Sequence, residues 1–233
     1  MMERAVRIFA TFKKECAARY ISHLDTLRTV QRALRRADIP VKYSGGYNPH
    51  PVLSFASALS VGVTSLGEVF DVALAEDMDE HAFYEALAAH MPPAMPLVSA
   101  HAVEDDYPAA MALLAAADYH IDLRIYGSYD KDSVLSDIAG LMEQPMMADK
   151  KSKAGVKQVD LRELVIGGIK GSFAGDDALR VDVRCVSANE GALNPRLLLP
   201  FLTRELSHVD AEIERVALWA QRDGKYVALW DAI

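Results

Sequence analysis

The order of strand and helix patterns constrains the fold of this chain most, because one order occurs twice. Residues 5–12 alternate apolar and polar side chains, as a half-buried strand does, and residues 23–39 carry apolar side chains at helical spacing. The next patterns are a small-residue stretch at 52–58, a strand at 68–75, a helix at 79–91 and a strand at 97–103. This β-α-β-β-α-β order is typical of a ferredoxin-like unit.

The second half repeats the order at similar spacing. Its expected elements are a strand at 119–126, a helix at 131–143, strands at 158–166 and 179–186, a helix at 194–207, and strands at 214–220 and 225–230. Asp223-Gly224, between the last two strands, is a type I′ hairpin signal. The sequence therefore predicts an α+β fold of two tandem ferredoxin-like units with antiparallel sheets, over residues 1–106 and 107–233.

The first expected helix is amphipathic and has a stripe of arginines. Ser22 with Asp25 forms a capping signature, and Pro40 ends the helix. The apolar positions are Leu24, Leu27, Val30, Leu34 and Ala37, and the stripe on another side is Arg28, Arg32, Arg35 and Arg36. Guanidinium groups bind phosphates bidentately, so the stripe would hold an RNA backbone. A solvated face, or a face that docks on an acidic protein, explains it at least as well.

A loop of unusual composition follows this helix, Tyr43-Ser-Gly-Gly-Tyr-Asn-Pro-His-Pro51. Two glycines and two prolines in so short a stretch restrict the backbone strongly, and turn chemistry alone explains them. The polar side chains are explained less well. Tyr43 and Tyr47 would stack on bases, and Asn48 and His50 would contact bases or sugars.

A second basic cluster, Lys150, Lys151 and Lys153, lies on an expected loop near Lys157. It would extend a phosphate-binding surface, although a flexible solvated loop is the simpler explanation. The net charge of −8 also conceals a basic first segment, because residues 1–60 contain ten lysines and arginines against four acidic residues. This asymmetry fits either an anionic partner or internal pairing with the acidic residues between 68 and 106.

Several classes of protein are not indicated. No apolar run is long enough for a membrane helix and the charged start differs from a secretory signal, so we expect a cytoplasmic protein without membrane contact. Cys16 and Cys185 lie far apart, and the seven histidines show no ligand spacing, so we predict no metal site and no cofactor. Redox or radical chemistry would have to come from another chain.

A catalytic alternative uses His50. A histidine with a tyrosine and a lysine nearby, here Tyr43 and Lys42, is the composition that metal-free ribonucleases use for acid–base cleavage at a 2′-hydroxyl. Because histidine is more often structural, this remains the alternative.

The motifs together resemble the radical-SAM-linked protein family, a domain of unknown function that is fused to, or encoded beside, radical SAM proteins. The residues that carry the resemblance are Tyr20-Ile-Ser-His-Leu-Asp-Thr-Leu-Arg28, RALRRADIP at 32–40, the loop at 43–51, Ser54-Phe55, Leu59-Ser-Val-Gly-Val63, Gly67-Glu68, Asp71, KKSKAGVKQVDLR at 150–162 and Asn194-Pro195. The resemblance implies a radical SAM protein as partner and points toward RNA metabolism.

Three hypotheses follow for the function. The leading one is a non-catalytic accessory module that binds RNA and presents it to a radical SAM enzyme for modification or processing. The second is the metal-free endoribonuclease with His50. The third is a protein-interaction module that docks on the radical SAM partner without binding RNA.

Overall fold

The chain divides into two units, described here from a computed structural model of residues 6–104, 106–152, 155–188 and 191–233. The first unit is Met1–Ala115 together with Ala217–Ile233, and the second is Ala116–Val216. Both mix helices with mostly antiparallel sheets, so the fold is α+β. The sequence placed one boundary after residue 106, whereas the chain returns to the first unit at its end. The reason is strand β11 (His208–Arg222), whose 15 residues begin in one unit and end in the other.

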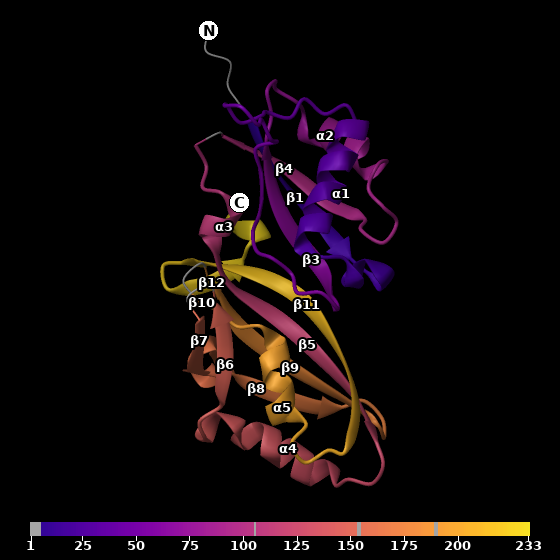
Figure 1. Cartoon of the computed structure of the whole chain (residues 1–233), viewed down its shortest axis with the longest axis vertical. Coiled ribbons are helices and arrows are strands. Elements are labelled where there is room, and N and C mark those ends of the chain that lie inside the picture. The colour runs from indigo at the N-terminus through magenta and orange to yellow at the C-terminus, as the bar shows by residue number, and fades with distance from the viewer. Residues whose placement is uncertain (1–5, 105, 153–154, 189–190) are drawn as a thin grey trace. The chain divides into compact units, whose positions relative to one another are not determined.

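Strand β1 (Val6–Lys14) is central in the sheet of the first unit (Figure 1). It pairs antiparallel with β3 (Val63–Ala73) on one side and with β4 (Leu97–Glu104) on the other. The short strand β2 (Leu53–Phe55) pairs antiparallel with β3, which gives the order β2-β3-β1-β4. Strand β3 begins at Val63, earlier than the sequence indicated.

The core of the first unit lies between one face of this sheet and the helices α1 (His23–Arg36) and α2 (Glu80–Ala88). Successive inward residues of β1 are fully buried, as the alternating pattern predicted. Three aromatic rings, Phe12, Phe55 and Phe70, pack together with centroids 5.8 to 6.0 Å apart. Burial of these large side chains fixes α1 on the sheet and so decides which side of the helix faces solvent.

The opposite face of the sheet holds a buried polar network. The Asp71 carboxylate accepts hydrogen bonds from the Ser54 hydroxyl at 2.7 Å and from the Ala110 amide at 3.1 Å, at the start of α3 (Ala110–Leu113). Arg7 Nη1 lies 3.9 Å from the same carboxylate and donates to the Tyr107 carbonyl at 3.1 Å. Two residues of the sequence pattern, Ser54 and Asp71, thus help to hold residues 107–110 against the sheet.

The second unit is built around β5 (Leu114–Tyr126), which pairs antiparallel with β9 (Ala178–Ala188). Strand β8 (Val165–Phe173) pairs antiparallel with β9, and β11 neighbours β5, so the order is β8-β9-β5-β11. The short strand β10 (Gly191–Ala192) also pairs with β9. Helix α4 (Lys131–Gly140) packs closely on β8, since a Cβ at Gly171 would come within 3.2 Å of the Leu135 and Ile138 side chains.

Two predicted elements of the second unit are wrong. The expected strand over 158–166 is interrupted by a 3₁₀ turn, Leu161–Leu164, because Asp160 accepts from the Arg162 amide and binds its guanidinium. That guanidinium holds the pKa of Asp160 at about 2. The expected helix over 194–207 is only a 3₁₀ turn, Pro195–Leu198, and a single turn α5 (Leu199–Leu202), where Pro200 supplies no amide donor.

Two hairpins complete the fold. Strands β6 (Met147–Ser152) and β7 (Gly155–Asp160) form a separate two-stranded sheet, which the sequence did not predict. Strands β11 and β12 (Lys225–Ala228) pair around Asp223 and Gly224, whose φ angles of 51° and 75° confirm the predicted type I′ turn. Over the described ranges, no helix is both long and apolar enough to cross a bilayer.

Candidate nucleic-acid interface

Helix α1 begins where the sequence predicted. The Ser22 hydroxyl oxygen accepts from the Asp25 amide at 3.1 Å, and the hydroxyl donates to the Asp25 carboxylate at 2.7 Å. The buried side of the helix consists of Thr26, Val30, Ala33 and Leu34. Leu24, expected on that side, is 58% exposed because it lies in the first turn next to the arginines.

The arginine face, defined here as Arg28, Arg32, Arg35 and Arg36, is exposed as a whole on the side of α1 away from the core. Arg28 pairs with Asp25 at 3.1 Å, and Arg32 donates to the Thr29 hydroxyl at 3.2 Å. Arg36 donates to the His90 carbonyl at 2.7 Å, which leaves other donors of its guanidinium available. The side chain of Arg35 makes no hydrogen bond or ion pair with any described residue.

The acidic residues of the first unit do not neutralise this face. In the described part of the chain, no carboxylate between residues 68 and 104 or at residue 106 forms an ion pair with the four arginines. Asp25 is the one acidic partner there, and both side chains of its pair with Arg28 are more than half exposed. The Ser22 hydroxyl, followed by Arg28, lowers the pKa of Asp25. Four positive charges therefore face solvent, and among the described residues one of them is paired with a carboxylate.

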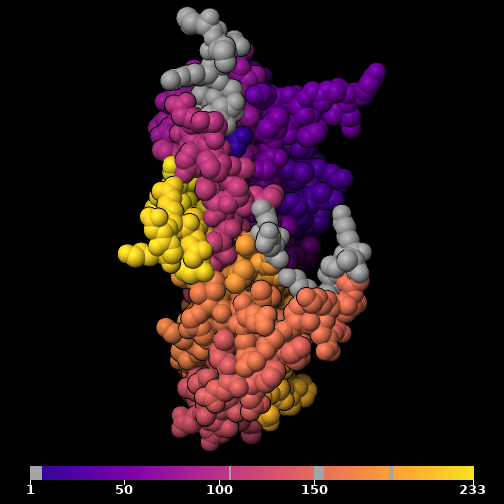
Figure 2. All heavy atoms as spheres, turned by 90° about the vertical axis from the view of Figure 1, so that its left-hand side faces the viewer, coloured from indigo at the N-terminus to yellow at the C-terminus, as the bar shows by residue number. Residues whose placement is uncertain are grey.

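The tyrosine loop, residues 43–51, follows α1 and is closed at its base by Ser44 and His50. The Ser44 amide donates to the His50 carbonyl at 2.9 Å, and the Ser44 Oγ lies 2.9 Å from His50 Nδ1. At the tip, Gly46 has a φ of +102°, and the Tyr47 side chain is fully exposed. Figure 2 shows the loop, in violet, projecting from its unit. Tyr43 is half exposed and pairs with Pro51 at the base.

Hydrogen bonding gives His50 a role in the shape of this loop. Its Nδ1 faces the Ser44 hydroxyl, and its amide donates to the same oxygen at 3.1 Å. Tyr43 and Lys42 precede Ser44 on the same strand segment, where the Lys42 amide donates to the Ala73 carbonyl. The loop base therefore places all three residues of the catalytic alternative on one hairpin, with one His50 nitrogen engaged by Ser44.

The second basic cluster lies partly outside the described residues. Lys153 lies outside the described residues, and the side chains of Lys150 and Lys151 are also outside what is described. Their backbone belongs to β6, where Lys150 stands opposite Lys157 of β7, and Lys157 is exposed. The backbone of Lys150 and Lys151 is thus on a strand rather than on the expected loop, and the phosphate contacts of the cluster stay a prediction.

A second group of arginines lies on the sheet of the second unit, and sequence reasoning missed its pairing. Arg184 binds the Asp118 carboxylate through two hydrogen bonds of 2.6 and 2.9 Å, and Arg180 binds Asp122 through bonds of 2.7 and 2.9 Å. Between them His120 Nε2 lies 3.2 Å from Asp182. We call these cross-strand pairs of β5 and β9 the paired face. The alternating acidic and basic residues of both strands were the available signal.

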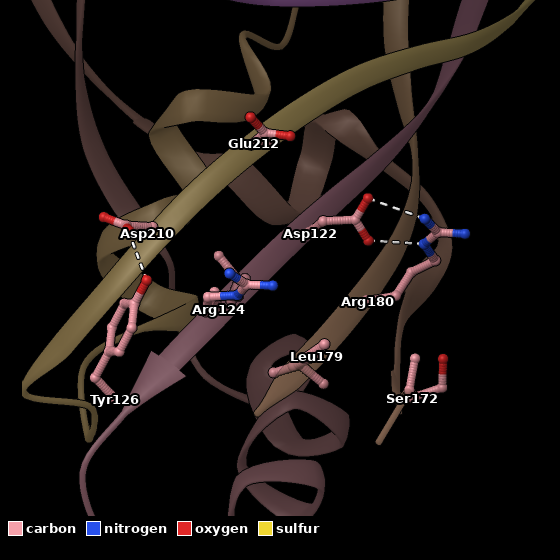
Figure 3. A pocket seen from close by; sticks show the side chains of 11 residues that line it. Asp122, Arg124, Tyr126, Ser172, Leu179, Arg180, Asp210 and Glu212 are labelled. Atoms are coloured by element: carbon pink, nitrogen blue, oxygen red, sulfur yellow. Dashed lines mark hydrogen bonds and ion pairs between the residues drawn. The ribbon is translucent and has the colours of Figure 1, made fainter. Parts of the chain in front are cut away.

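A cavity of about 730 Å³ in the second unit opens on the same strands. Figure 3 shows the Asp122–Arg180 pair on one side and the Tyr126 hydroxyl pointing to Asp210 on the other, with Arg124 between them. The Tyr126 hydroxyl donates to Asp210 at 2.9 Å, and this bond raises the pKa of Tyr126. Arg124 lies 3.8 Å from Asp177. The charged groups of this cavity are therefore engaged with one another or with close neighbours.

Metal-ligating side chains do not gather in the described ranges, where no group of three or more His, Cys, Asp or Glu residues is placed to hold an ion. Cys16 is exposed and Cys185 is buried in β9. Burial raises the pKa of the Cys185 thiol to about 12, with a smaller contribution from the charge of Asp118. Cys185 is therefore a protonated core residue.

Comparison with known proteins shows the family to which this chain belongs. Residues 7–195 match the family described as "Uncharacterized protein conserved in bacteria (DUF2344)". No curated protein matches. Among solved structures, a Cbf5-Nop10-Gar1 complex matches at 11% identity and a TM-score of 0.46, over 90% of this chain and 48% of that one. An H/ACA RNP bound to a substrate RNA containing 2′-deoxyuridine matches at 12% identity and a TM-score of 0.44, over 92% and 47%.

An archaeal box H/ACA sRNP Nop10-Cbf5 complex gives a similar result, with 12% identity and a TM-score of 0.44 over 88% of this chain and 46% of the other. The chain spans about half the length of the solved chains it matches. These values are too low to establish a shared fold.

Proposed function

We propose that this chain, which belongs to the DUF2344 family of uncharacterized bacterial proteins, is an RNA-binding module. The RNA contacts the arginine face of α1 and the tyrosine loop. One observation carries the proposal: four arginines lie on one exposed helix face next to a projecting loop with two exposed tyrosines. Basic groups that track phosphates beside aromatic rings that stack on bases are the usual composition of a single-strand binding surface.

The arginines are suited to phosphates because the fold uses few of their donors. A guanidinium has five N–H donors, and Arg32 and Arg36 each donate one hydrogen bond to a described residue. The Arg35 guanidinium donates none to a described residue. The remaining donors point into solvent, where a phosphate would accept two at a time.

The tyrosine loop supplies the second part of the surface. The pairing of Ser44 with His50 holds the loop base, so Tyr47 is presented fully exposed at the tip and Tyr43 half exposed at the base. Exposed aromatic rings on a restrained loop lose little entropy when a base stacks on them. Asn48 and His50 would contact the base or sugar next to Tyr47. The lysines 150, 151 and 153 would contribute further phosphate contacts.

Two finer assignments belong to the same proposal. The strand orders β2-β3-β1-β4 and β8-β9-β5-β11 support two ferredoxin-like units, with the hairpin β6–β7 inserted in the second. The resemblance of the motifs supports a radical SAM protein as the partner that acts on the bound RNA. With two cysteines in all, the chain itself lacks the thiolates that ligate an iron–sulfur cluster. Co-elution of this chain with a radical SAM protein encoded beside it tests that partner.

A salt titration of RNA binding tests the main proposal. Fluorescence anisotropy with a labelled single-stranded RNA is measured for the wild type and for the variant in which Arg28, Arg32, Arg35 and Arg36 are all replaced by Gln. Each lost phosphate contact removes about 0.7 from the slope of log K against log salt for a single strand, so the variant should lose about 2 to 3 from this slope. Circular dichroism confirms that the variant remains folded.

A matched control separates position from charge. Replacing Arg124, Arg180, Arg196 and Arg204 of the second unit by Gln removes the same formal charge from other exposed positions. We expect its salt slope to equal that of the wild type. An equal decrease in both variants contradicts the proposed site, because RNA would then bind through overall charge alone. If the wild type binds no RNA at any salt concentration, the proposal fails and a helix that docks on an acidic protein is favoured.

A further inference from the structure

A small cavity lies where the arginine face meets the tyrosine loop. It has a volume of about 200 Å³ and is formed by the last turns of α1, the segment that follows it and the base of the loop. Its lining residues are Gln31, Leu34, Arg35, Asp38, Ile39, Pro40, Val41, Tyr43 and Pro51. Pockets for drug-sized ligands have volumes of about 300–1,000 Å³, so this cavity, called here the base slot, suits a single flat base.

The slot has an apolar floor and a polar rim. Leu34 and Ile39 are almost completely buried, at 1% and 6% exposure, and Tyr43 is half exposed at the loop side. Gln31, Arg35 and Asp38 form the polar part of the lining. An apolar floor with a few convergent polar groups is the usual build of a ligand site.

The opposite charges on the rim do not neutralise each other. Arg35 and Asp38 are three residues apart, yet no ion pair or side-chain hydrogen bond joins them, and neither side chain has a partner among the residues the structure describes. The Asp38 backbone explains this, because its φ of +53° lies in the left-handed region just after the helix ends, which takes the side chain off the helical spacing. A pure acceptor and a pure donor are thus held around the same cavity.

We propose that the base slot binds a guanine base of the RNA strand. This inference rests on the proposed function and specifies which base the surface selects. Among the four bases only guanine presents two adjacent acceptors, O6 and N7, and two adjacent donors, N1–H and N2–H. Arg35 matches the acceptor pair and Asp38 matches the donor pair. Tyr43 stacks on the base plane, and the neighbouring arginines hold the flanking phosphates.

Binding of two short RNAs tests the selection. One is an oligouridine and the other carries a single guanine at its centre. We expect the guanine-containing RNA to bind the wild type about 10-fold more tightly, within the range that one bidentate base contact supplies. In Asp38→Asn this preference should disappear, because an amide offers one acceptor and a competing donor in place of two acceptors. Asn tolerates left-handed φ, so the variant should fold.

Asp223→Asn is the matched control. Asp223 also has a left-handed φ, of 51°, and lies in an exposed turn of the same unit, so the substitution removes the same charge from an equivalent backbone conformation. Its guanine preference should equal that of the wild type. Tyr43→Phe should retain tight binding and Tyr43→Ala should weaken it, as expected for a stacking contact.

The outcomes separate the inference from the function it rests on. If the wild type binds both RNAs equally, or if Asp38→Asn and Asp223→Asn behave alike, RNA binding stands and the guanine slot is overturned. If neither RNA binds, the proposed function itself fails. If 5′-GMP alone binds as tightly as the guanine-containing RNA, the slot serves a free nucleotide, and its assignment to an RNA strand is overturned.

Discussion

The arginine face and the paired face carry the same functional group in opposite situations. On the paired face, Arg180 and Arg184 each bind an aspartate of the neighbouring strand through two hydrogen bonds between 2.6 and 2.9 Å. On the arginine face, Arg35 binds nothing in the described chain, and Arg32 and Arg36 each bind one neutral oxygen. The presence of arginines does not distinguish the two surfaces, whereas the partners of those arginines do.

The difference follows from the secondary structure on which each group lies. Strands β5 and β9 pair in a register that sets Asp118 opposite Arg184 and Asp122 opposite Arg180, so each positive charge meets a negative one. Helix α1 has its arginines at helical spacing and only Asp25 among them. Arginines that pair with carboxylates of their own fold contribute to stability. Arginines whose N–H donors have no acceptor in the fold are available to an anionic ligand.

The largest effect on stability is expected for Arg184→Ala. Both side chains of the Arg184–Asp118 pair are 28% exposed, so the variant leaves a partly buried carboxylate without its two charged donors. The expected loss in free energy of unfolding is about 1–3 kcal/mol. Urea unfolding measures the global effect. A loss below about 0.5 kcal/mol, the usual size for a surface substitution, would contradict the distinction between the faces.

The neighbouring Cys185 reports the same change locally. Its thiol is buried and has a pKa of about 12, so a thiol reagent at pH 8 reaches it only through opening of β9, while the exposed Cys16 reacts directly. In Arg184→Ala the slow labelling phase should become faster in proportion to the lost stability, and the fast phase should be unchanged.

Arg180→Ala is expected to have a smaller effect. Its pair with Asp122 has the same two-bond geometry, but both side chains are 48% exposed and screened by water. We expect a loss below about 1 kcal/mol, which decreases further at high salt concentration. Urea unfolding at low and high salt measures it. If Arg180→Ala destabilises the protein more than Arg184→Ala, side-chain exposure does not determine how much each pair contributes to the free energy of unfolding.

The sequence predicted the parts of this comparison that depend on local pattern. The start of α1 and the exposure of its arginines follow from the Ser22 cap and helical spacing, both of which act within a few residues. The prediction that Leu24 lies on the buried side was wrong, because apolar spacing does not show where the first turn leaves the core. The helix predicted over 194–207 is shorter in the structure, because Pro200 and the tertiary fold limit it to a single turn.

The sequence could not predict the parts that depend on distant contacts. The pair of Asp118 with Arg184 joins residues 66 positions apart and needs the register of β5 and β9. The base slot needs the left-handed backbone of Asp38 and the pairing of Tyr43 with Pro51, neither of which has a periodic signal. Local patterns thus predicted which arginines are exposed, and the fold was required to show which of them are unpaired.

Arg35→Gln is expected to have the smallest effect on stability and therefore tests the comparison most sharply. Because no described residue binds the Arg35 side chain, the variant loses only the weak interaction of a basic group with the last turn of α1, and unfolding in urea should shift by less than about 0.5 kcal/mol. RNA binding should nevertheless weaken, and the preference for the guanine-containing RNA should be lost, because Arg35 is the donor to the acceptor pair of the base in the proposed slot. Destabilisation as large as in Arg184→Ala would show that the fold uses Arg35 itself, and its donors would then not be reserved for a ligand.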